Sequence, residues 1–188
     1  MLVGRNAYCR GTSLIEVLMF IVVIGVAAGG ILMLFANTSR ASADPLIRKQ
    51  ALAIAESLLE EVRLMPFSFC DADDANASTA TGSFVGATGC AATVEVMGPE
   101  AGESRYAVLT PFDNVNDYNG FAMAGGIVDI NGTAIAGLAA YSVVVTVTPL
   151  VFGGIPATDS QQITVSVTGP GNTAVTLDGI RTRYAPNL

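Results

Sequence analysis

The segment from Leu14 to Phe35 reads LIEVLMFIVVIGVAAGGILMLF, and Glu16 is its only charged residue. As an α-helix it would span about 33 Å, close to the thickness of the hydrocarbon core of a bilayer. Arg5 and Arg10 precede it, with no acidic residue before Glu16. Because positive flanks stay on the cytoplasmic side of membranes, we expect a transmembrane helix with a cytoplasmic N-terminus, followed by an exported C-terminal portion.

The composition of the chain argues against several classes of protein. Of its 188 residues 13% are charged, with 9 Lys+Arg against 16 Asp+Glu, a formal net charge of −7 and no histidine. A nucleic-acid binder needs a basic surface to neutralise phosphates, so nucleic acid is not an expected partner. Without histidine, the commonest general base and the Ser-His and Cys-His pairs are missing, so we expect neither an enzyme nor a cofactor.

A cleaved secretory signal is the alternative interpretation of the apolar segment. Ala41-Ser42-Ala43 before Asp44 fits the small-residue pattern of a cleavage site. Cleavage there would release an exported binding module, with Tyr118 and Phe121 as candidate aromatic contacts for a ligand. However, the apolar run exceeds the length of about 7–15 residues usual in signal peptides, and Arg40 lies close to the proposed cut. A retained helix is therefore favoured.

The residues around Glu16 form a second pattern, Arg10-Gly11-Thr12-Ser13-Leu14-Ile15-Glu16, followed by the long apolar run. It resembles the prepilin signal of type IV pilins and type II secretion pseudopilins. The resemblance implies that residues 1–11 are a leader, that a membrane-embedded peptidase cuts after Gly11, and that it methylates the new amine of Thr12. Major pilins usually carry phenylalanine where this chain has Thr12.

A carboxylate near the start of a membrane span costs about 2.5 to 3.5 kcal/mol on insertion scales. One explanation for Glu16 is that its side chain reaches back to the interface. A cut after Gly11 gives another, because it leaves an ammonium group on Thr12 at the depth of Glu16, both in the same chain and in a neighbouring subunit. Two unit charges about 4 Å apart gain about 4 kcal/mol at an effective dielectric constant of about 20, which matches that cost. We therefore expect Glu16 to act in subunit assembly.

The apolar segment is predicted to continue into a longer helix. Residues 12–38 form its transmembrane half and residues 39–67 an amphipathic half. Asp44-Pro45 predicts a helix restart or kink, since Asp suits an N-cap and Pro the first turn, and Pro66 predicts the end of the helix. Between them, apolar residues recur about every 3.5 residues, a stripe expected to pack on a sheet. Its members are Ile47, Ala51, Ile54, Leu58, Val62 and Met65.

Residues 68–188 predict a β-rich head. Residues 127–135, with Asn131-Gly132 at the centre, predict a hairpin with a type I′ turn. An antiparallel meander follows from three β-branched runs, at residues 141–151, 161–168 and 173–184. Thr93–Met97 and Arg105–Thr110 are predicted as short strands. A helical stem with an antiparallel sheet belongs to the α+β class.

Two cysteines follow the apolar segment, Cys70 and Cys90, and Cys9 would leave with the leader. In an oxidising compartment the pair predicts one disulfide, worth about 3 kcal/mol, with two free thiols as the alternative. Two stretches rich in Asp and Asn, at 71–74 and 113–119, offer oxygen ligands of the kind calcium takes. Neither matches the EF-hand pattern, and both residue types are common in turns, so no metal site is predicted.

Further stretches narrow the resemblance to a group of minor type IV pilins of Gram-negative bacteria, the mannose-sensitive haemagglutinin (MSHA) biogenesis protein D group. They are SADPLIRKQALAIAESLLEEVRLMPF at 42–67, FDNVNDYNGF at 112–121, VVVTVTP at 143–149 and LDGIRTRY at 177–184. The resemblance implies a low-abundance subunit that primes or joins a pilus. It would reside in the inner membrane with a periplasmic head, and reach the cell surface on assembly.

The partners implied by the resemblance are the major and other minor pilins, the prepilin peptidase, an inner-membrane assembly platform with its ATPase, and membrane lipid. A minor pseudopilin of a type II secretion system is the alternative within the superfamily. A membrane-anchored periplasmic enzyme is a further hypothesis, for which the sequence offers no catalytic motif.

Overall fold

The computed structural model describes residues 13–183, and of residues 36–44 it describes the backbone alone. The chain divides into two units, Met1–Ala43 and Asp44–Leu188. Helix α1 (Leu14–Leu64) contributes residues to both units, whereas the sheet belongs to the second.

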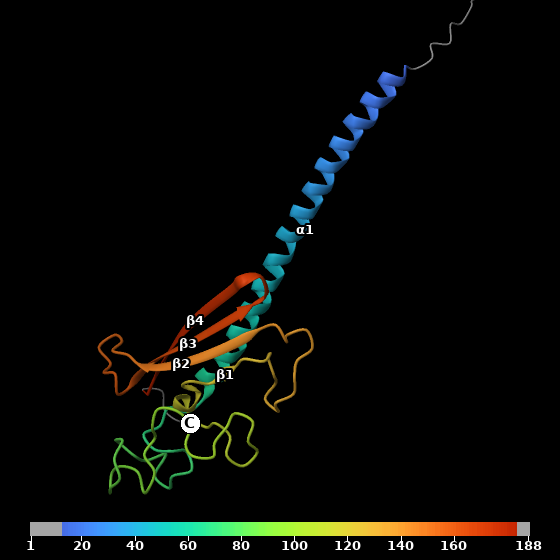
Figure 1. Cartoon of the computed structure of the whole chain (residues 1–188). Coiled ribbons are helices and arrows are strands. Elements are labelled where there is room, and N and C mark those ends of the chain that lie inside the picture. Colours follow the sequence, from blue (N-terminus) through green and yellow to red (C-terminus); the bar gives the residue numbers. More distant parts are fainter. Residues whose placement is uncertain (1–12, 184–188) are drawn as a thin grey trace, which may run out of the picture. The chain divides into compact units, whose positions relative to one another are not determined.

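Helix α1 (Leu14–Leu64) is continuous through Pro45 (Figure 1). Of the restart or kink predicted at Asp44-Pro45, the restart is therefore wrong. Proline removes one backbone donor, but its fixed φ lies in the helical range, so the residues after it continue the helix. The predicted end is confirmed, since α1 stops at Leu64 and the residue before Pro66 is disfavoured in the helical conformation.

The second unit contains a four-stranded antiparallel sheet in the order β1-β2-β3-β4 (Figure 1). A short 3-10 helix, η2 (Pro170–Asn172), connects β3 to β4. The last three strands are the predicted meander, and with α1 they confirm the α+β class. The two-residue strand β1 was not predicted. The strands are β1 (Ala122–Met123), β2 (Ser142–Pro149), β3 (Ser160–Gly169) and β4 (Thr173–Thr182).

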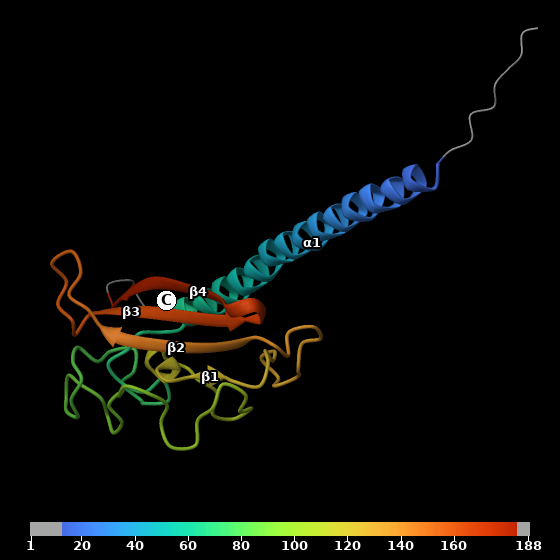
Figure 2. The ribbon, with the colours of Figure 1, turned by 45° about the horizontal axis from the view of Figure 1, so that its top comes forward.

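The core of the second unit lies between this sheet and the C-terminal part of α1 (Figure 2). The register of β2 and β3 pairs buried residues with each other: Val143 with Val167, Val145 with Val165, and Val147 with Ile163. The predicted apolar stripe of α1 is confirmed as the helix face that packs in this core. Its buried members are Ala51, Leu58 and Val62, joined by Ala55, and Ile47, Ile54 and Met65 are half-buried.

The stretch between α1 and β1 is largely irregular, and the short strands predicted at Thr93–Met97 and Arg105–Thr110 are wrong. Cys70 and Val94 form only an isolated antiparallel bridge. The cause is that the backbone groups of these stretches bind nearby loop atoms. The Thr93 N–H donates to the Asp74 carboxylate at 2.8 Å. The Ser104 N–H donates to the Thr110 carbonyl at 3.2 Å, and this second bond closes a loop.

The hairpin predicted at residues 127–135 is present as one bridge, between Val128 and Ala134, but its type I′ turn is wrong. That turn needs positive φ at both central residues, and of the Asn131-Gly132 pair only Gly132 has it, with φ of 77°. The Asp129 carboxylate instead accepts the N–H groups of Asn131 and Thr133, at 2.8 Å each. This side-chain turn competes with the I′ geometry.

Candidate functional site

The segment Leu14–Phe35 forms the N-terminal part of α1 and has a mean hydropathy of 2.8. Its length and composition fit a transmembrane or a signal helix. No side chain in it is buried, and its large apolar side chains are between 46% exposed, at Val17, and 82% exposed, at Leu14. A helix that is apolar all round is typical of contact with lipid or with other helices.

Glu16 lies in the first turn of α1, and its side chain is exposed. The N–H groups of Glu16 and Val17 donate to the Ser13 carbonyl at 3.0 and 3.2 Å. A carboxylate in this position interacts favourably with the free N–H groups at a helix N-terminus. Gly11 and Thr12, the predicted cleavage and methylation residues, lie outside the described residues.

Three glycines, Gly25, Gly29 and Gly30, lie inside the apolar part of α1. A Cβ atom added at any of them would meet nothing within 4 Å. Each lowers helix stability by about 1 kcal/mol relative to alanine. Packing inside the described chain therefore gives no reason for glycine at these positions.

The predicted disulfide between Cys70 and Cys90 is confirmed. It lies in the irregular region after α1. Asp74, in the same region, is hydrogen-bonded to the backbone of neighbouring loop residues. The carboxylate of Asp74 accepts four backbone N–H groups, from Asn76 and from residues 91, 92 and 93, at 2.7 to 2.8 Å. These bonds, from Thr93 first, lower the pKa of Asp74 well below its ordinary value. Asp74 therefore organises a loop, and its oxygens are already bonded.

The polar stretch 113–119 contains the 3-10 helix η1 (Val115–Tyr118) and its caps. The Asn114 side chain accepts the Asn116 N–H, and the Asp117 carboxylate accepts the Asn114 N–H at 2.7 Å, which makes a capping box. The Asn119 side chain accepts the Val147 N–H of β2 at 3.1 Å. The expected role of these residues in turns is confirmed, except that one oxygen of Asp117, Oδ1, is buried without a partner.

Glu61 of α1 forms a bidentate ion pair with Arg105, whose Nε and terminal nitrogen lie 2.6 and 2.7 Å from the two carboxylate oxygens. The Tyr118 hydroxyl donates to the same carboxylate at 2.7 Å. Burial alone would raise the pKa of Glu61, but the hydrogen bonds from Arg105 and Tyr118 and the charge of Arg105 outweigh it and lower the pKa. This cluster joins α1 to the loop before η1 and to η1 itself.

A groove of about 500 Å³ runs beside this ion pair, lined mainly by apolar side chains that include Ile54, Leu58 and Met123. Neither Tyr118 nor Phe121, the aromatic contacts expected for a released module, lines this groove. Tyr118 is 1% exposed and its hydroxyl is bound to Glu61, so it belongs to the core. Phe121 is half-buried and packs edge-on against Tyr118, with ring centroids 6.0 Å apart.

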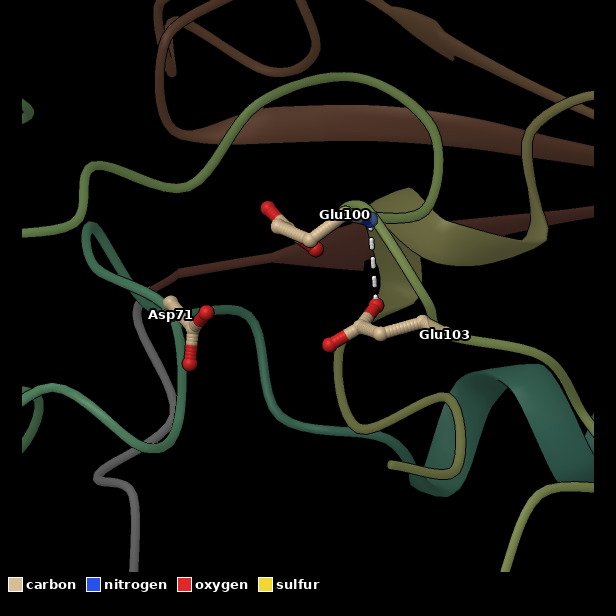
Figure 3. A group of neighbouring side chains, drawn as sticks. All are labelled: Asp71, Glu100 and Glu103. Atoms are coloured by element: carbon tan, nitrogen blue, oxygen red, sulfur yellow. Dashed lines mark hydrogen bonds between the residues drawn. The ribbon is translucent and has the colours of Figure 1, made fainter. Parts of the chain in front are cut away.

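Five carboxylates from three separate segments come together in the second unit. One group is Asp71, Glu100 and Glu103, and the other is Glu95, Glu100 and Asp117. Within each group, one oxygen of every residue lies within 4.8 Å of the others. Figure 3 shows the first group: the Asp71 carboxylate, from the segment after α1, faces those of Glu100 and Glu103.

This acidic cluster was not predicted from the sequence, where Asp71 and Asp117 lie in two separate polar stretches and the glutamates were not singled out. The available signal was the spacing of Glu95, Glu100 and Glu103 around Gly98-Pro99, three acidic residues in a short segment without a lysine or arginine.

No protein family model, curated protein or solved structure matches the chain.

Proposed function

We propose that this chain is a membrane-anchored assembly subunit of the type IV pilin kind, a minor pilin that is cut after Gly11 and joins a filament through the N-terminal half of α1. One observation carries the proposal: Glu16 is the only charged residue in a segment, Leu14–Phe35, whose side chains are exposed all round. A lipid anchor alone needs no carboxylate there, and one is costly in lipid.

Assembly gives this carboxylate a function. Cleavage after Gly11 creates an ammonium group on Thr12, four residues before Glu16 in the sequence. When helices pack side by side, the ammonium of one subunit reaches the carboxylate of the next. The attraction, about 4 kcal/mol at an effective dielectric constant of about 20, makes the polymer more favourable than the isolated subunit.

The rest of the apolar segment supports the same proposal. Its exposed aliphatic side chains suit contact first with lipid and then with neighbouring helices. The open space beside Gly25, Gly29 and Gly30 lets a neighbouring backbone approach closely, and the same glycines make local melting of the helix easier. Close packing and local melting would both help a helix that moves from lipid into contact with neighbouring helices.

Under this proposal the subunit has several assembly partners and occupies two locations in turn. The prepilin peptidase processes the leader, an inner-membrane platform extracts the subunit from lipid, and major and other minor pilins receive it. The head is periplasmic before assembly and reaches the cell surface with the pilus. The resemblance favours an MSHA-type pilus, with a type II secretion pseudopilus as the alternative; co-purification with a major pilin or with a major pseudopilin distinguishes them.

The intact mass of the mature protein is the first test. We expect a chain that begins at Thr12, with or without one added methyl group. The competing hypothesis, a binding module released after Ala43, predicts a chain that begins at Asp44, which is also where the second unit begins. A mature chain that begins at Asp44, or one that keeps its leader, contradicts the proposal.

Substitution of Glu16 is the second test. We expect Glu16→Ala to be cleaved and inserted like the wild type but to be missing from sheared filaments, by at least tenfold on immunoblots. Glu56→Ala is the matched control, because Glu56 is another exposed carboxylate of α1 but lies in the second unit. Normal incorporation of the Glu16 variant would show that no charge pairing takes place there.

A further inference from the structure

The acidic cluster of the second unit is organised around Glu100, which belongs to both groups of carboxylates. Asp71 reaches it from the residue after Cys70, Glu95 and Glu103 come from the same loop as Glu100, and Asp117 comes from η1. Carboxylates normally repel one another and separate into solvent unless a cation or a proton lies between them. Here the fold holds them together.

Several oxygens of the cluster are buried without a partner. Glu95 is 8% exposed, and neither of its carboxylate oxygens accepts a hydrogen bond. Asp117 is fully buried and its Oδ1 is free, although its Oδ2 accepts the N–H groups of Asp113 and Asn114 at 2.9 and 2.7 Å. One oxygen of Glu100, Oε1, is also unpartnered. Native proteins rarely leave such atoms unsatisfied, so the free oxygens point to a ligand.

Within residues 13–183, the ion pairs are Glu61 with Arg105 and Asp159 with Arg183, and neither includes a member of the cluster. Arg183 interacts electrostatically with Glu95, but its ion pair is with Asp159.

We propose that this cluster is a Ca²⁺ site, in which Glu95, Glu100 and Asp117 provide the ligands and Asp71 and Glu103 add oxygens on the other side of Glu100. The two hydrogen bonds to Oδ2 of Asp117 fix the orientation of that carboxylate, as outer-shell bonds do in metal sites. The site belongs to the second unit, so it does not depend on how the N-terminal segment functions.

The chemistry of the ligands selects calcium. All are carboxylate oxygens, the donors that Ca²⁺ takes in sets of about six to eight at about 2.3–2.6 Å. Two oxygens on opposite sides of such an ion are about 4.6–5.2 Å apart, so a group whose atoms lie within 4.8 Å of one another can surround one ion. Mg²⁺ is smaller and keeps several waters, and Zn²⁺ prefers nitrogen and sulfur, which are missing here because both nearby cysteines form the disulfide.

The site would connect parts of the chain that lack regular structure. Asp71 is next to the disulfide, Glu95 to Glu103 lie in the loop that follows it, and Asp117 belongs to the helical turn that abuts β2. An ion bound to all three segments stabilises the folded state relative to the unfolded chain, where the ligands are far apart.

The test uses the full chain in detergent micelles, stripped with EDTA and titrated with CaCl₂ or MgCl₂. We expect a saturable Ca²⁺ isotherm with one equivalent in calorimetry, at least tenfold weaker Mg²⁺ binding, and a rise of several degrees in the unfolding temperature. Glu100→Gln, which alters the residue shared by both groups, should weaken Ca²⁺ binding at least tenfold, whereas Glu56→Gln on the exposed side of α1 should leave it unchanged. Equal shifts with both metals, or unchanged binding by the Glu100 variant, would overturn the proposal.

Glu95→Gln provides an independent test, because its effect on stability should depend on Ca²⁺ only if Glu95 binds the ion. It keeps the shape of the side chain but replaces a carboxylate ligand with a neutral amide. We therefore expect it to lower the unfolding temperature much more in excess Ca²⁺ than in EDTA, relative to the wild type. A variant that is less stable than the wild type in both conditions by the same amount, together with no Ca²⁺ isotherm for the wild type, contradicts the site.

Discussion

The two halves of α1 have the same secondary structure and opposite surroundings. In the half that belongs to the second unit, Leu58 is 3% exposed and Val62 is fully buried, because the sheet covers one face of the helix. In the segment Leu14–Phe35, Leu18 is 53% exposed and Phe35 67% exposed. Each half has a large apolar surface, but only one half meets its partner within the described chain. An exposed apolar surface of this kind is typical of contact with lipid or with other chains.

The charged residues differ in the same way. Glu61 lies in the second half and is bound by Arg105 and Tyr118. Glu16 lies in the first half, and among residues 13–183 it forms no ion pair. A carboxylate with partners inside the chain contributes to folding, whereas one without them is available for a partner outside it. Matched substitutions in the two halves can therefore separate folding from assembly.

The largest contrast is expected from leucine to alanine substitutions. Leu58→Ala should lower the free energy of unfolding by about 3 kcal/mol, because it removes buried methyl groups and leaves a cavity between α1 and the sheet. Leu18→Ala should change it by less than about 0.5 kcal/mol, as is usual for exposed positions. Urea unfolding of the full chain in micelles, followed by near-ultraviolet circular dichroism of the tyrosines, measures both. Equal losses would mean that the N-terminal half also contributes to the folded core.

An intermediate effect is expected from Glu61→Gln and depends on pH. The pKa of Glu61 is lowered from its ordinary value of 4.5 in the folded state, so its charge stabilises the fold above that pH, and the stabilisation is lost as the pH falls through the folded pKa. At neutral pH the variant should be less stable than the wild type by about 2 kcal/mol, the value of hydrogen bonds to a charged group. The difference should narrow below pH 4.5 in urea titrations. A difference that stays constant with pH would show that the charge itself is not involved.

The sequence predicts those structural features that arise from residues close together in the chain, and it does not predict contacts between residues far apart in the chain. Alternation of Val143, Val145 and Val147 predicts β2, and the spacing of Ala51 and Leu58 predicts the buried face of α1, because each pattern is local. Asp74 binds residues 91–93, and Glu61 binds Arg105, 44 positions away. No local pattern indicates such contacts. For the same reason the loops around η1, and the cluster centred on Glu100, emerge only from the structure.

The same distinction applies to the candidate functional residues, Glu16 and the acidic cluster. Glu16 is recognisable from its neighbours in sequence, because a lone charge in an apolar run is itself a local signal. The acidic cluster is not, since Asp71, Glu95 and Asp117 lie in three segments that only folding brings together. Turn-forming Asp and Asn residues look the same in sequence whether their oxygens bind backbone N–H groups, as those of Asp74 do, or remain free, as Oδ1 of Asp117 does.

The smallest effects should come from exchanging glycine and alanine between the two halves. Ala53→Gly, at an exposed position of the second half, should lower the free energy of unfolding by about 1 kcal/mol through helix propensity alone. Gly29→Ala should not destabilise the chain, because the new Cβ meets nothing within 4 Å and alanine favours the helix. If the open space at Gly29 receives a neighbouring helix, or lets this helix melt on assembly, the same variant should enter filaments less well while its head unfolds at the wild-type urea concentration. Wild-type incorporation of Gly29→Ala would show that assembly makes no use of this glycine, and the contrast between the halves would then rest on Glu16 and the exposed aliphatic side chains.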